Sequence, residues 1–320
     1  MEDETLIEVK NLVKLYGNHA AVDSLSFTVE TGKVVGFLGP NGAGKSTTMN
    51  MITGYIAPTS GTVLIDGVDM EEEPEKVRKN IGYLPENPPL YPDMRVREYL
   101  YFVAELKKVA RNKRDVMVNE IMNRTKIVDV SERLIRHLSK GYKQRVGVAG
   151  AMMGYPEILI LDEPTSSLND EDAKMLLDLL MEFKKNGLTS IIITHKLNEI
   201  IYCADRCTII RDGTTIETLT KGVDDLSEDR IIKGMVGRSM DDRYPTRKHN
   251  VSKEVMLEVK DWTVHHPLYP EKIVDNKINC KVHKGEVVGF SGLQGAGRTE
   301  FAMSVFGKSY GSNISGELYI

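Results

Sequence analysis

The sequence predicts an α/β fold built around a mostly parallel core sheet. Short, uninterrupted apolar runs at residues 158–161 and 191–193 are typical of strands that are buried on both faces. Strand and helix patterns alternate from residue 157 to residue 193, which indicates parallel crossover units. A glycine-rich loop joins a compact apolar strand, residues 33–38, to a helix that we expect to begin at Lys45. These three features define the fold class.

Two other parts are expected beside the core sheet. Alternating apolar residues over 6–12 and 22–29 predict antiparallel strands with one solvated face. From about residue 78 to residue 151 the pattern is helical, which predicts a helical subdomain at about residues 86–150. Four apolar residues there share one helix face, the spacing of a core-facing helix: Val96, Leu100, Val103 and Leu106.

Composition limits the possible functions. The chain has 320 residues, of which 41% are hydrophobic and 28% charged, as in ordinary globular proteins. Its net charge of -4 argues against a nucleic-acid partner, because such proteins carry a basic surplus. The three cysteines show no paired spacing, which indicates a reducing, cytosolic compartment. No apolar run approaches the length of a membrane span, so work at a membrane would need another subunit.

The chain begins a second copy of its first part. Three segments return in the same order: 6–10 as 256–260, 32–37 as 285–290 and 60–65 as 315–320. Such self-similarity indicates a duplicated domain. We therefore expect a complete domain over residues 1–215, a linker with one short helix capped by Ser227 over 216–252, and the N-terminal part of a second domain over 253–320.

The loop after the first apolar strand matches the phosphate-binding pattern Gly-x-x-x-x-Gly-Lys-Ser in full. Its glycines let backbone N–H groups point at a phosphate, which the N-terminus of the following helix also attracts. Lys45 is expected to reach the β- and γ-phosphates, and the Ser46 hydroxyl to hold Mg²⁺. The loop therefore predicts ATP or GTP binding, through Gly39, Pro40, Asn41, Gly42, Ala43, Gly44, Lys45, Ser46 and Thr47.

Two acids end the apolar run 158–161. Asp162 is placed to coordinate Mg²⁺, directly or through water, and Glu163 to orient and deprotonate an attacking water. Two acids that merely cap a strand end would be equally ordinary in isolation. Downstream of a phosphate-binding loop, the catalytic interpretation is favoured.

Residues 138–145, Leu-Ser-Lys-Gly-Tyr-Lys-Gln-Arg, resemble the signature motif of the ABC ATPases. In that family a serine and a glycine at a helix N-terminus grip the γ-phosphate bound by the partner domain. Ser139 and Gly141 match these positions, whereas Lys140 and Tyr142 depart from the commonest form, Leu-Ser-Gly-Gly-Gln. Alone, the segment would fit a plain helix cap as well.

The same resemblance assigns further positions. Tyr16 stands where the family has an aromatic that stacks on adenine, and His195 matches the switch histidine, a catalytic residue that contacts the γ-phosphate. Glu86 occupies the place of the Q-loop glutamine, where a carboxylate could ligate Mg²⁺ but adds negative charge beside the phosphates. Asn169 replaces the usual D-loop aspartate. The loop 88–91 is expected near the surface that docks a membrane subunit.

The resemblance covers residues 5–215, with six motifs in the expected order. It implies a P-loop NTPase fold of the ABC ATPase type and ATP hydrolysis with Lys45, Glu163 and His195 as catalytic residues. It also implies ATP and Mg²⁺ as cofactors and a homodimer formed through the first domain. Transmembrane permease subunits would be direct partners and an extracytoplasmic solute-binding protein an indirect one. The chain would be a soluble, peripheral subunit at the cytoplasmic face of the cell membrane.

Different segments resemble different branches of this family. Up to about residue 154, segments such as 81–91 resemble single-domain ATPases of efflux-type transporters. From about residue 156 onward, segments such as 195–199 resemble monosaccharide importers, which carry two ATPase domains on one chain. This contrast leads to the hypothesis of a hybrid chain. We expect a transporter of a sugar or other small solute, the alternatives being an efflux ATPase, a non-transport clamp on the ribosome or nucleic acid, and an inert ATP-binding fragment.

The second copy has a weakened phosphate-binding loop at residues 292–299. Arg298 stands in the place of Lys45, and its planar guanidinium does not fill the compact pocket of an ammonium group. We therefore expect weak nucleotide binding there and no hydrolysis.

Overall fold

The computed structural model describes residues 4–237, 251–292, 295–307 and 309–320. The chain divides into two compact units, over residues 1–241 and 242–320. Each unit is described by itself.

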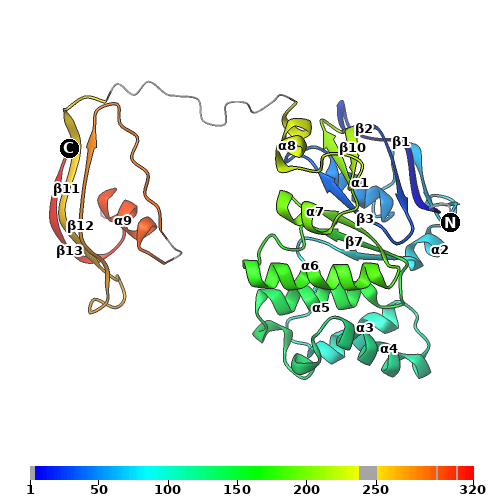
Figure 1. Ribbon diagram of the computed structural model, residues 1–320. Helices are drawn as coiled ribbons and strands as arrows, with labels where there is room; N and C mark the ends of the chain where they lie inside the picture. Colours follow the sequence, from blue (N-terminus) through cyan, green and yellow to red (C-terminus); the bar gives the residue numbers. More distant parts are fainter. Residues whose placement is uncertain (1–3, 238–250, 293–294, 308) are drawn as a thin grey trace. The chain divides into compact units, whose positions relative to one another are not determined.

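A six-stranded sheet forms the centre of the first unit (Figure 1). Its strands lie in the spatial order β10 (Thr214–Thr220), β9 (Arg206–Arg211), β3 (Val34–Leu38), β8 (Thr189–Ile193), β7 (Ile158–Asp162) and β6 (Ile81–Leu84). All neighbours run parallel except β10, which pairs antiparallel with β9. Every residue of β3, β7 and β8 is buried, which confirms the buried strands expected from the apolar runs. The strand β6, by contrast, lies inside the segment 78–151, whose pattern was interpreted as helical. The sequence did not reveal this strand, because four residues are too few to show a strand period of their own.

An antiparallel sheet lies against one side of this core. Its order is β2 (His19–Glu30), β1 (Thr5–Tyr16), β4 (Ser60–Ile65) and β5 (Val68–Asp69), which confirms the predicted antiparallel strands. The helix α1 (Lys45–Ile52) packs into the same apolar layer, which includes Phe37, Ile158 and Ile160. The helix α2 (Pro74–Lys79) lies between β5 and β6 in the chain and contributes the buried Val77 to this layer.

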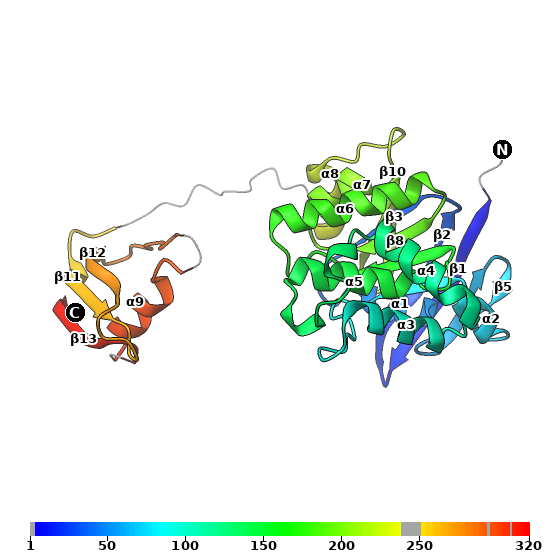
Figure 2. The same cartoon turned by 90° about the horizontal axis from the view of Figure 1, so that it is seen from below.

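Helices cover the other side of the core sheet (Figures 1 and 2). They are α3 (Val96–Leu106), α4 (Arg111–Arg124), α5 (Lys140–Met152), α6 (Asp170–Lys185) and α7 (Leu197–Cys203), with short 3-10 turns at Val128–Val130 and Ile135–His137. Leu159 and Leu161 of β7 face this layer, as the alternation along a strand requires. Of the predicted helical stripe, Val96 and Leu100 are fully buried, whereas Leu106 is exposed at the end of α3.

The first unit extends beyond the expected boundary at residue 215, which falls inside β10. Residue Ser227 caps the helix α8 (Glu228–Val236), as predicted, and its hydroxyl accepts a hydrogen bond from the backbone N–H of Arg230. This helix packs on β9 and β10 through the fully buried Ile231, so it belongs to the domain rather than to a linker. The surrounding charged residues concealed this apolar contact. Most of the extended segment expected at 243–252 lies outside the described residues.

The second unit repeats the antiparallel part of the first. The strands β12 (Ile273–His283), β11 (Val255–His265) and β13 (Ser312–Tyr319) have the order of β2, β1 and β4, and α9 (Arg298–Val305) corresponds to α1. Trp262 and Phe301 are buried in its small core. The repeat of β3, residues 286–292, forms no strand, and Val287 is 85% exposed. The strands β8 and β9 hold β3 in the first unit, and the described part of the second unit contains no counterpart of either.

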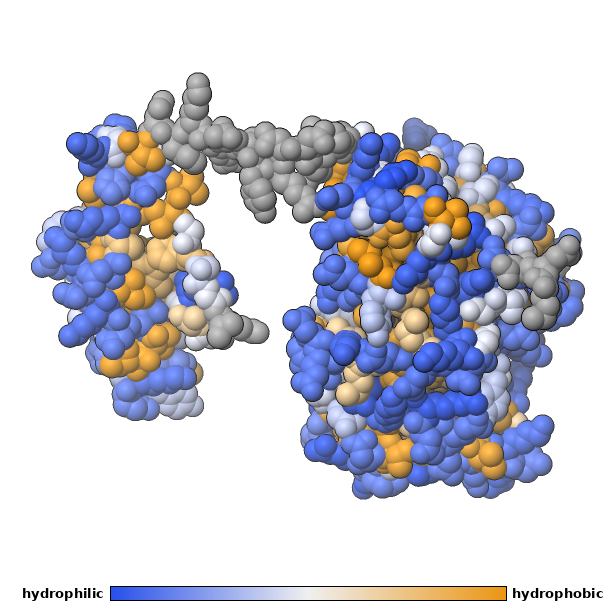
Figure 3. All heavy atoms as spheres, viewed as in Figure 1, coloured by the Kyte–Doolittle hydropathy of each residue, from blue (hydrophilic) through white to orange (hydrophobic). Residues whose placement is uncertain are grey.

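The face of the molecule shown in Figure 3 is mostly hydrophilic. On the face seen in Figure 3, apolar residues form separate patches among hydrophilic ones. Among the described residues, no helix combines the length and the apolar character that crossing a bilayer requires.

The boundary of the first unit can be tested by truncation. We expect a chain of residues 1–241 to unfold cooperatively, whereas a chain of residues 1–215 should lose the buried side chains Leu219 and Ile231. Since burial of one large apolar side chain contributes about 2–5 kcal/mol, the shorter chain should be less stable by at least about 4 kcal/mol. Urea unfolding followed by circular dichroism measures this difference. Equal midpoints for the two chains would contradict the boundary.

Candidate functional site

Steric constraints require glycine at two positions of the phosphate-binding loop between β3 and α1. At Gly39, an added Cβ would lie 2.2 Å from the carbonyl oxygen of Ile210. Gly44, which precedes α1, has φ of 93°, and an added Cβ there would lie 2.3 Å from the carbonyl oxygen of Ala21. The loop therefore passes against the backbones of β2 and β9, and a side chain at either position would displace it.

The side chain of Lys45 is folded into this loop. Its ammonium group donates hydrogen bonds to the carbonyl oxygens of Gly39, at 2.7 Å, and Pro40, at 2.9 Å. Burial lowers the pKa of this ammonium group, while the nearby carboxylates of Glu163 and Asp162 act in the opposite direction. The loop carbonyls thus hold a cation at the start of α1, where the helix N-terminus also attracts anions.

Asp162, the last residue of β7, lies among other acidic groups. Burial raises the pKa of its carboxyl group, and the charges of Glu163 and Glu86 raise this pKa further. A hydrogen bond from the Ser46 hydroxyl and the charge of Lys45 oppose the shift. The donors gathered here are hydroxyl and carboxylate oxygens, the ligands that Mg²⁺ prefers, and a divalent cation would offset the surplus negative charge. The residues present therefore fit a magnesium ion.

Glu163 and His195 are in direct contact. Nδ1 of His195 lies 2.8 Å from Oε2 of Glu163, although the two residues follow different strands. The backbone of Glu163 is left-handed, with φ of 46°, and its N–H donates to the carbonyl oxygen of Ile193 at 2.8 Å. Such a conformation is costly for a non-glycine residue and is characteristic of functional sites. The turn aims the Glu163 carboxylate across the end of β8 at His195.

These groups line one cleft of about 450 Å³ at the carboxyl ends of β3, β7 and β8. Ligands of open α/β sheets bind at this edge. Most of the residues predicted from the sequence meet here, and Ala21 and Ile193 complete the wall. The cleft is lined by Ala21, Asn41, Gly42, Ala43, Gly44, Lys45, Ser46, Thr47, Glu86, Asp162, Glu163, Ile193 and His195.

Five residues predicted to bind nucleotide do not line this cleft. Gly39 and Pro40 lie in the phosphate-binding loop, where their carbonyl oxygens hold Lys45, and the other three are Tyr16, Ser139 and Gly141. Tyr16, at the end of β1, is 54% exposed and is paired with His19 across the turn into β2. Ser139 caps α5, and its hydroxyl oxygen accepts a hydrogen bond from the backbone N–H of Tyr142. Gly141 packs against the carboxyl group of Asp172 on α6, which an added Cβ would approach to 2.3 Å. The structure thus brings the signature motif to α6 and not to the cleft of its own chain.

Asn169, the D-loop position, also has a local role. It caps α6, and its Oδ1 accepts a hydrogen bond from the backbone N–H of Asp172 at 2.8 Å. Asp172 thereby connects the start of α6 with the signature segment at Gly141.

Tyr83 on β6 is a residue of the site that the motifs did not reveal. Burial raises the pKa of its hydroxyl to about 12, with the charge of Asp162 and a hydrogen bond to it as further causes. The structure shows why Tyr83 belongs to the site: it lies near the end of β6, which runs parallel to β7, and it pairs with Ile160 of β7. This pairing was visible only once the neighbouring strands were known.

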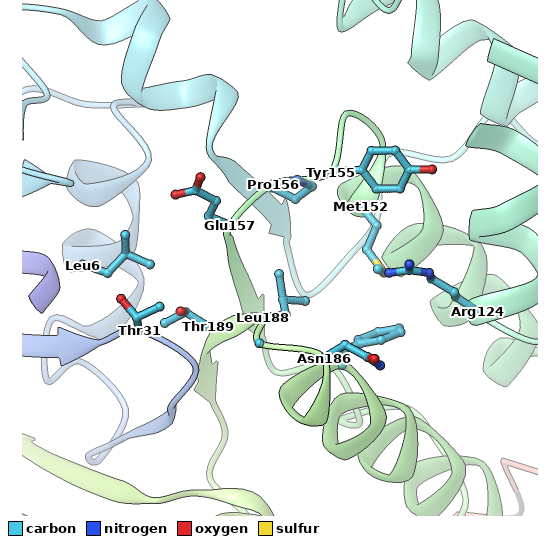
Figure 4. A pocket seen from close by; sticks show the side chains of 12 residues that line it. Leu6, Thr31, Arg124, Met152, Tyr155, Pro156, Glu157, Asn186, Leu188 and Thr189 are labelled. Carbon is cyan, nitrogen blue, oxygen red and sulfur yellow. The ribbon is translucent and has the colours of Figure 1, made fainter. Parts of the chain in front are cut away.

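A second cavity, of about 270 Å³, lies at the opposite edge of the sheet (Figure 4). Its lining includes Pro156 and Glu157, just before β7, and Leu188, just before β8. Figure 4 shows Arg124 and Glu157 on opposite sides of it. Arg124 already pairs with Glu120 at 2.6 Å. The amino-terminal edge of a parallel sheet is not where such folds bind their ligands, so the cleft at the carboxyl ends is the candidate functional site.

The fold and this cleft define an ATP-binding domain of the P-loop class. Residues 22–166 match the family model described as "ABC transporter". This match identifies residues 22–166 as an ATP-binding domain of the ABC transporter type.

Several relatives are similar over nearly the whole chain. The L-arabinose transport ATP-binding protein AraG of Geobacillus stearothermophilus is 40% identical over 323 residues, which cover 99% of this chain and 63% of that protein. The xylose import ATP-binding protein XylG of Thermoanaerobacter pseudethanolicus is 35% identical over 99% of this chain and 63% of its own length. The ribose import ATP-binding protein RbsA of Bacillus licheniformis is 34% identical over 94% of this chain and 60% of its own length.

The chain thus spans less than two thirds of the length of these relatives. The alignment with the arabinose relative includes both the segments that resemble efflux ATPases and those that resemble sugar importers. The junction near residue 156 stays a hypothesis, because the single identity of this alignment does not compare the two halves of the domain.

Solved structures confirm the ABC ATPase fold expected from the sequence. CbiO1 from Clostridium perfringens, part of the ABC transporter complex cbiONQ, has a TM-score of 0.63 and 29% identity, over 68% of this chain and 89% of that one. The dimeric ATP-binding cassette MJ0796, bound to ADP and Pi, has a TM-score of 0.61 and 25% identity, over 67% of this chain and 98% of that one.

The raised pKa of Asp162 predicts a pH-dependent stability in the absence of metal and nucleotide. A carboxyl group whose pKa is higher in the folded than in the unfolded state opposes folding once it is ionised. Asp162→Asn should therefore raise the melting temperature at pH 7, by about 2–4 °C if roughly 1 kcal/mol is gained. The gain should shrink as the pH falls toward the ordinary pKa of aspartate, because both states are then protonated.

Differential scanning fluorimetry across pH measures this effect. Asp205→Asn is the matched control, since the Asp205 carboxylate accepts hydrogen bonds from the backbone N–H of Val34 and the Lys184 ammonium. This control should lower the melting temperature. A less stable Asp162→Asn chain at pH 7 would contradict the assignment of Asp162 as a destabilised acid.

Proposed function

We propose that this chain hydrolyses ATP with Mg²⁺ and thereby powers the import of a pentose through separate transmembrane permease subunits. The observation that carries the proposal is the 40% identity to an arabinose transport ATP-binding protein over 99% of the chain. The three named relatives act on arabinose, xylose and ribose, which are all five-carbon sugars. The names of the xylose and ribose relatives support import rather than efflux. The net charge of -4 gives no support to a clamp on nucleic acid.

The cleft has the groups that such a reaction requires. The Lys45 ammonium and the N–H groups of the loop would bind the phosphates, and Ser46, Asp162 and Glu86 would hold the metal. Bound Mg²⁺ supplies positive charge that offsets the charge developing on the transferred phosphoryl group. The Glu163 carboxylate would accept a proton from water as the water oxygen bonds to the γ-phosphorus and the bond to ADP breaks. His195 contacts that carboxylate and would hold it in place.

A dimer formed through the first unit would complete the site. Ser139 and Gly141 lie at the N-terminus of α5, a helix of 13 residues, outside the cleft of their own chain. A helix N-terminus attracts anions. In a dimer, the N-terminus of α5 from the second copy would lie against the γ-phosphate bound by the first copy. The separation of these residues from the cleft supports an arrangement in which two copies enclose the nucleotide.

A large cleft of about 1070 Å³ supports the docking of a permease segment. It includes Pro88, Pro89 and Tyr91 of the loop expected at such a surface, together with Tyr99 and Phe102 of α3. Tyr55, which is 81% exposed, belongs to the same lining. An exposed apolar cleft of this size marks an interaction site, and a peripheral subunit at the cytoplasmic face of the membrane would use it.

The proposed catalytic base can be tested by Glu163→Gln. The amide cannot accept the proton of the attacking water, so kcat should fall by about 100-fold or more. ATP binding should persist, and the ATP-bound dimer should accumulate, which size-exclusion chromatography with light scattering detects. Lys45→Ala is the control and should lose nucleotide binding together with dimer formation. Hydrolysis by Glu163→Gln at the parental rate would remove Glu163 from this role.

The sugar class can be tested in cells that carry the gene. Its deletion should lower the uptake of radiolabelled L-arabinose, D-xylose or D-ribose at least about tenfold for the true substrate, because uphill transport needs the motor. A plasmid copy should restore uptake, and a Glu163→Gln copy should not. Labelled glucose serves as the control sugar and should enter at an unchanged rate. Unchanged uptake of all three pentoses would reject the substrate class.

A further inference from the structure

The carboxylate of Glu199, in the short helix α7, is a buried charged group outside the nucleotide cleft. The residue is only 6% exposed. An ionised carboxylate is costly to bury unless hydrogen bonds and a counter-charge compensate it. Its partners therefore indicate what it contributes.

Both oxygens of this carboxylate accept hydrogen bonds from buried hydroxyl groups. Thr165 Oγ1 donates to Oε1 at 2.5 Å, and Thr194 Oγ1 donates to Oε2 at 2.9 Å. Neither threonine is exposed to solvent. Hydrogen bonds to a charged acceptor are stronger than those between neutral groups, and burial strengthens them further.

Lys196 closes the same network. Its ammonium group lies 3.5 Å from Oε1 of Glu199 and donates a hydrogen bond to the carbonyl oxygen of Thr165 at 2.9 Å. Its backbone N–H donates to Thr194 Oγ1 at 3.0 Å. The lysine thus supplies the counter-charge and contacts both threonine-containing segments.

The two bridged segments carry the pair that faces the γ-phosphate position. Thr165 is two residues after Glu163, and Thr194 directly precedes His195. The left-handed turn at Glu163 is a strained conformation that its surroundings must hold. The network of Glu199 and Lys196 holds the residues just after this turn against those just before His195.

We propose that Glu199, with Lys196 as its counter-ion, is a positioning residue for hydrolysis that sets the Glu163–His195 contact. This inference rests on the proposed ATPase activity. Glu199 is not among the residues that line the phosphate-binding cleft, so its removal changes the chemical step and leaves nucleotide binding intact.

The test uses the full chain and compares Glu199→Ala with Glu199→Gln. Alanine leaves two buried hydroxyls without an acceptor, so kcat per bound nucleotide should fall about tenfold or more, with KM for ATP within about threefold, since small misplacements of catalytic groups are costly. Glutamine can accept from one threonine and donate to the other, so it should restore kcat to within about threefold of the parent. Binding stoichiometry with a fluorescent ATP analogue provides the normalisation.

Thr194→Val and Thr165→Val keep the side-chain shape, and each removes one hydrogen bond to the Glu199 carboxylate. These variants therefore test the positioning role if Glu199→Ala does not fold. Each should lower kcat and leave KM unchanged. Asp205→Asn is the control. It removes another bridging carboxylate, whose partners Val34 and Lys184 do not line the cleft. It should therefore lower stability without changing kcat per bound nucleotide. A merely structural role of Glu199 would make its variants behave like this control and would overturn the inference.

A second measurement does not depend on turnover. The imidazole resonance of His195, assigned in a proton–carbon spectrum through its loss in His195→Ala, should shift in Glu199→Ala and in Thr194→Val but not in Asp205→Asn. If the parent chain releases no phosphate from ATP, the proposed function fails, while this spectrum still decides whether Glu199 sets the Glu163–His195 contact. An unshifted His195 resonance in both variants would reject it.

Discussion

The parallel register of the core sheet is the constraint on which the site depends. Gly36 of β3 and Leu161 of β7 both pair with Ile192 of β8, so the three strands end at the same level. Because the strands are buried on both faces, a shift of one strand by one residue would turn every one of its side chains to the opposite layer. The fixed register therefore brings a lysine after β3, two acids at the end of β7 and a histidine after β8 into one cleft.

The described part of the second unit contains no strands that correspond to β8 and β9. Its antiparallel strands, its helix α9 and its small core around Trp262 form as in the first unit, since these contacts are local to the repeat. Residues 286–292 repeat β3 in sequence and yet form no strand. An apolar segment becomes a central strand only when neighbours on both sides satisfy its backbone groups and cover its side chains. Sequence similarity alone could not convey that dependence.

The sequence predicted the parts of the site that lie within one motif. Lys45, Asp162 and Glu163 follow from a loop, a strand end and their order, and the structure places them together. Residues that act across the fold were out of reach. Tyr83 meets Asp162 only because β6 and β7 are neighbours, and the docking of α8 depends on contacts with β9 and β10 that its charged sequence conceals.

The short strand β6 connects two openings of the first unit. Tyr83 lines the large apolar cleft, and burial together with the charge of Asp162, which lines the nucleotide cleft, raises the pKa of its hydroxyl. A ligand of the apolar cleft that moved this ring would change the surroundings of a carboxylate that lines the nucleotide cleft. By thermodynamic reciprocity, any free energy that docking adds to nucleotide affinity is the free energy that nucleotide adds to docking. The ring of Tyr83 would then couple the two affinities, and this coupling could be measured from either side.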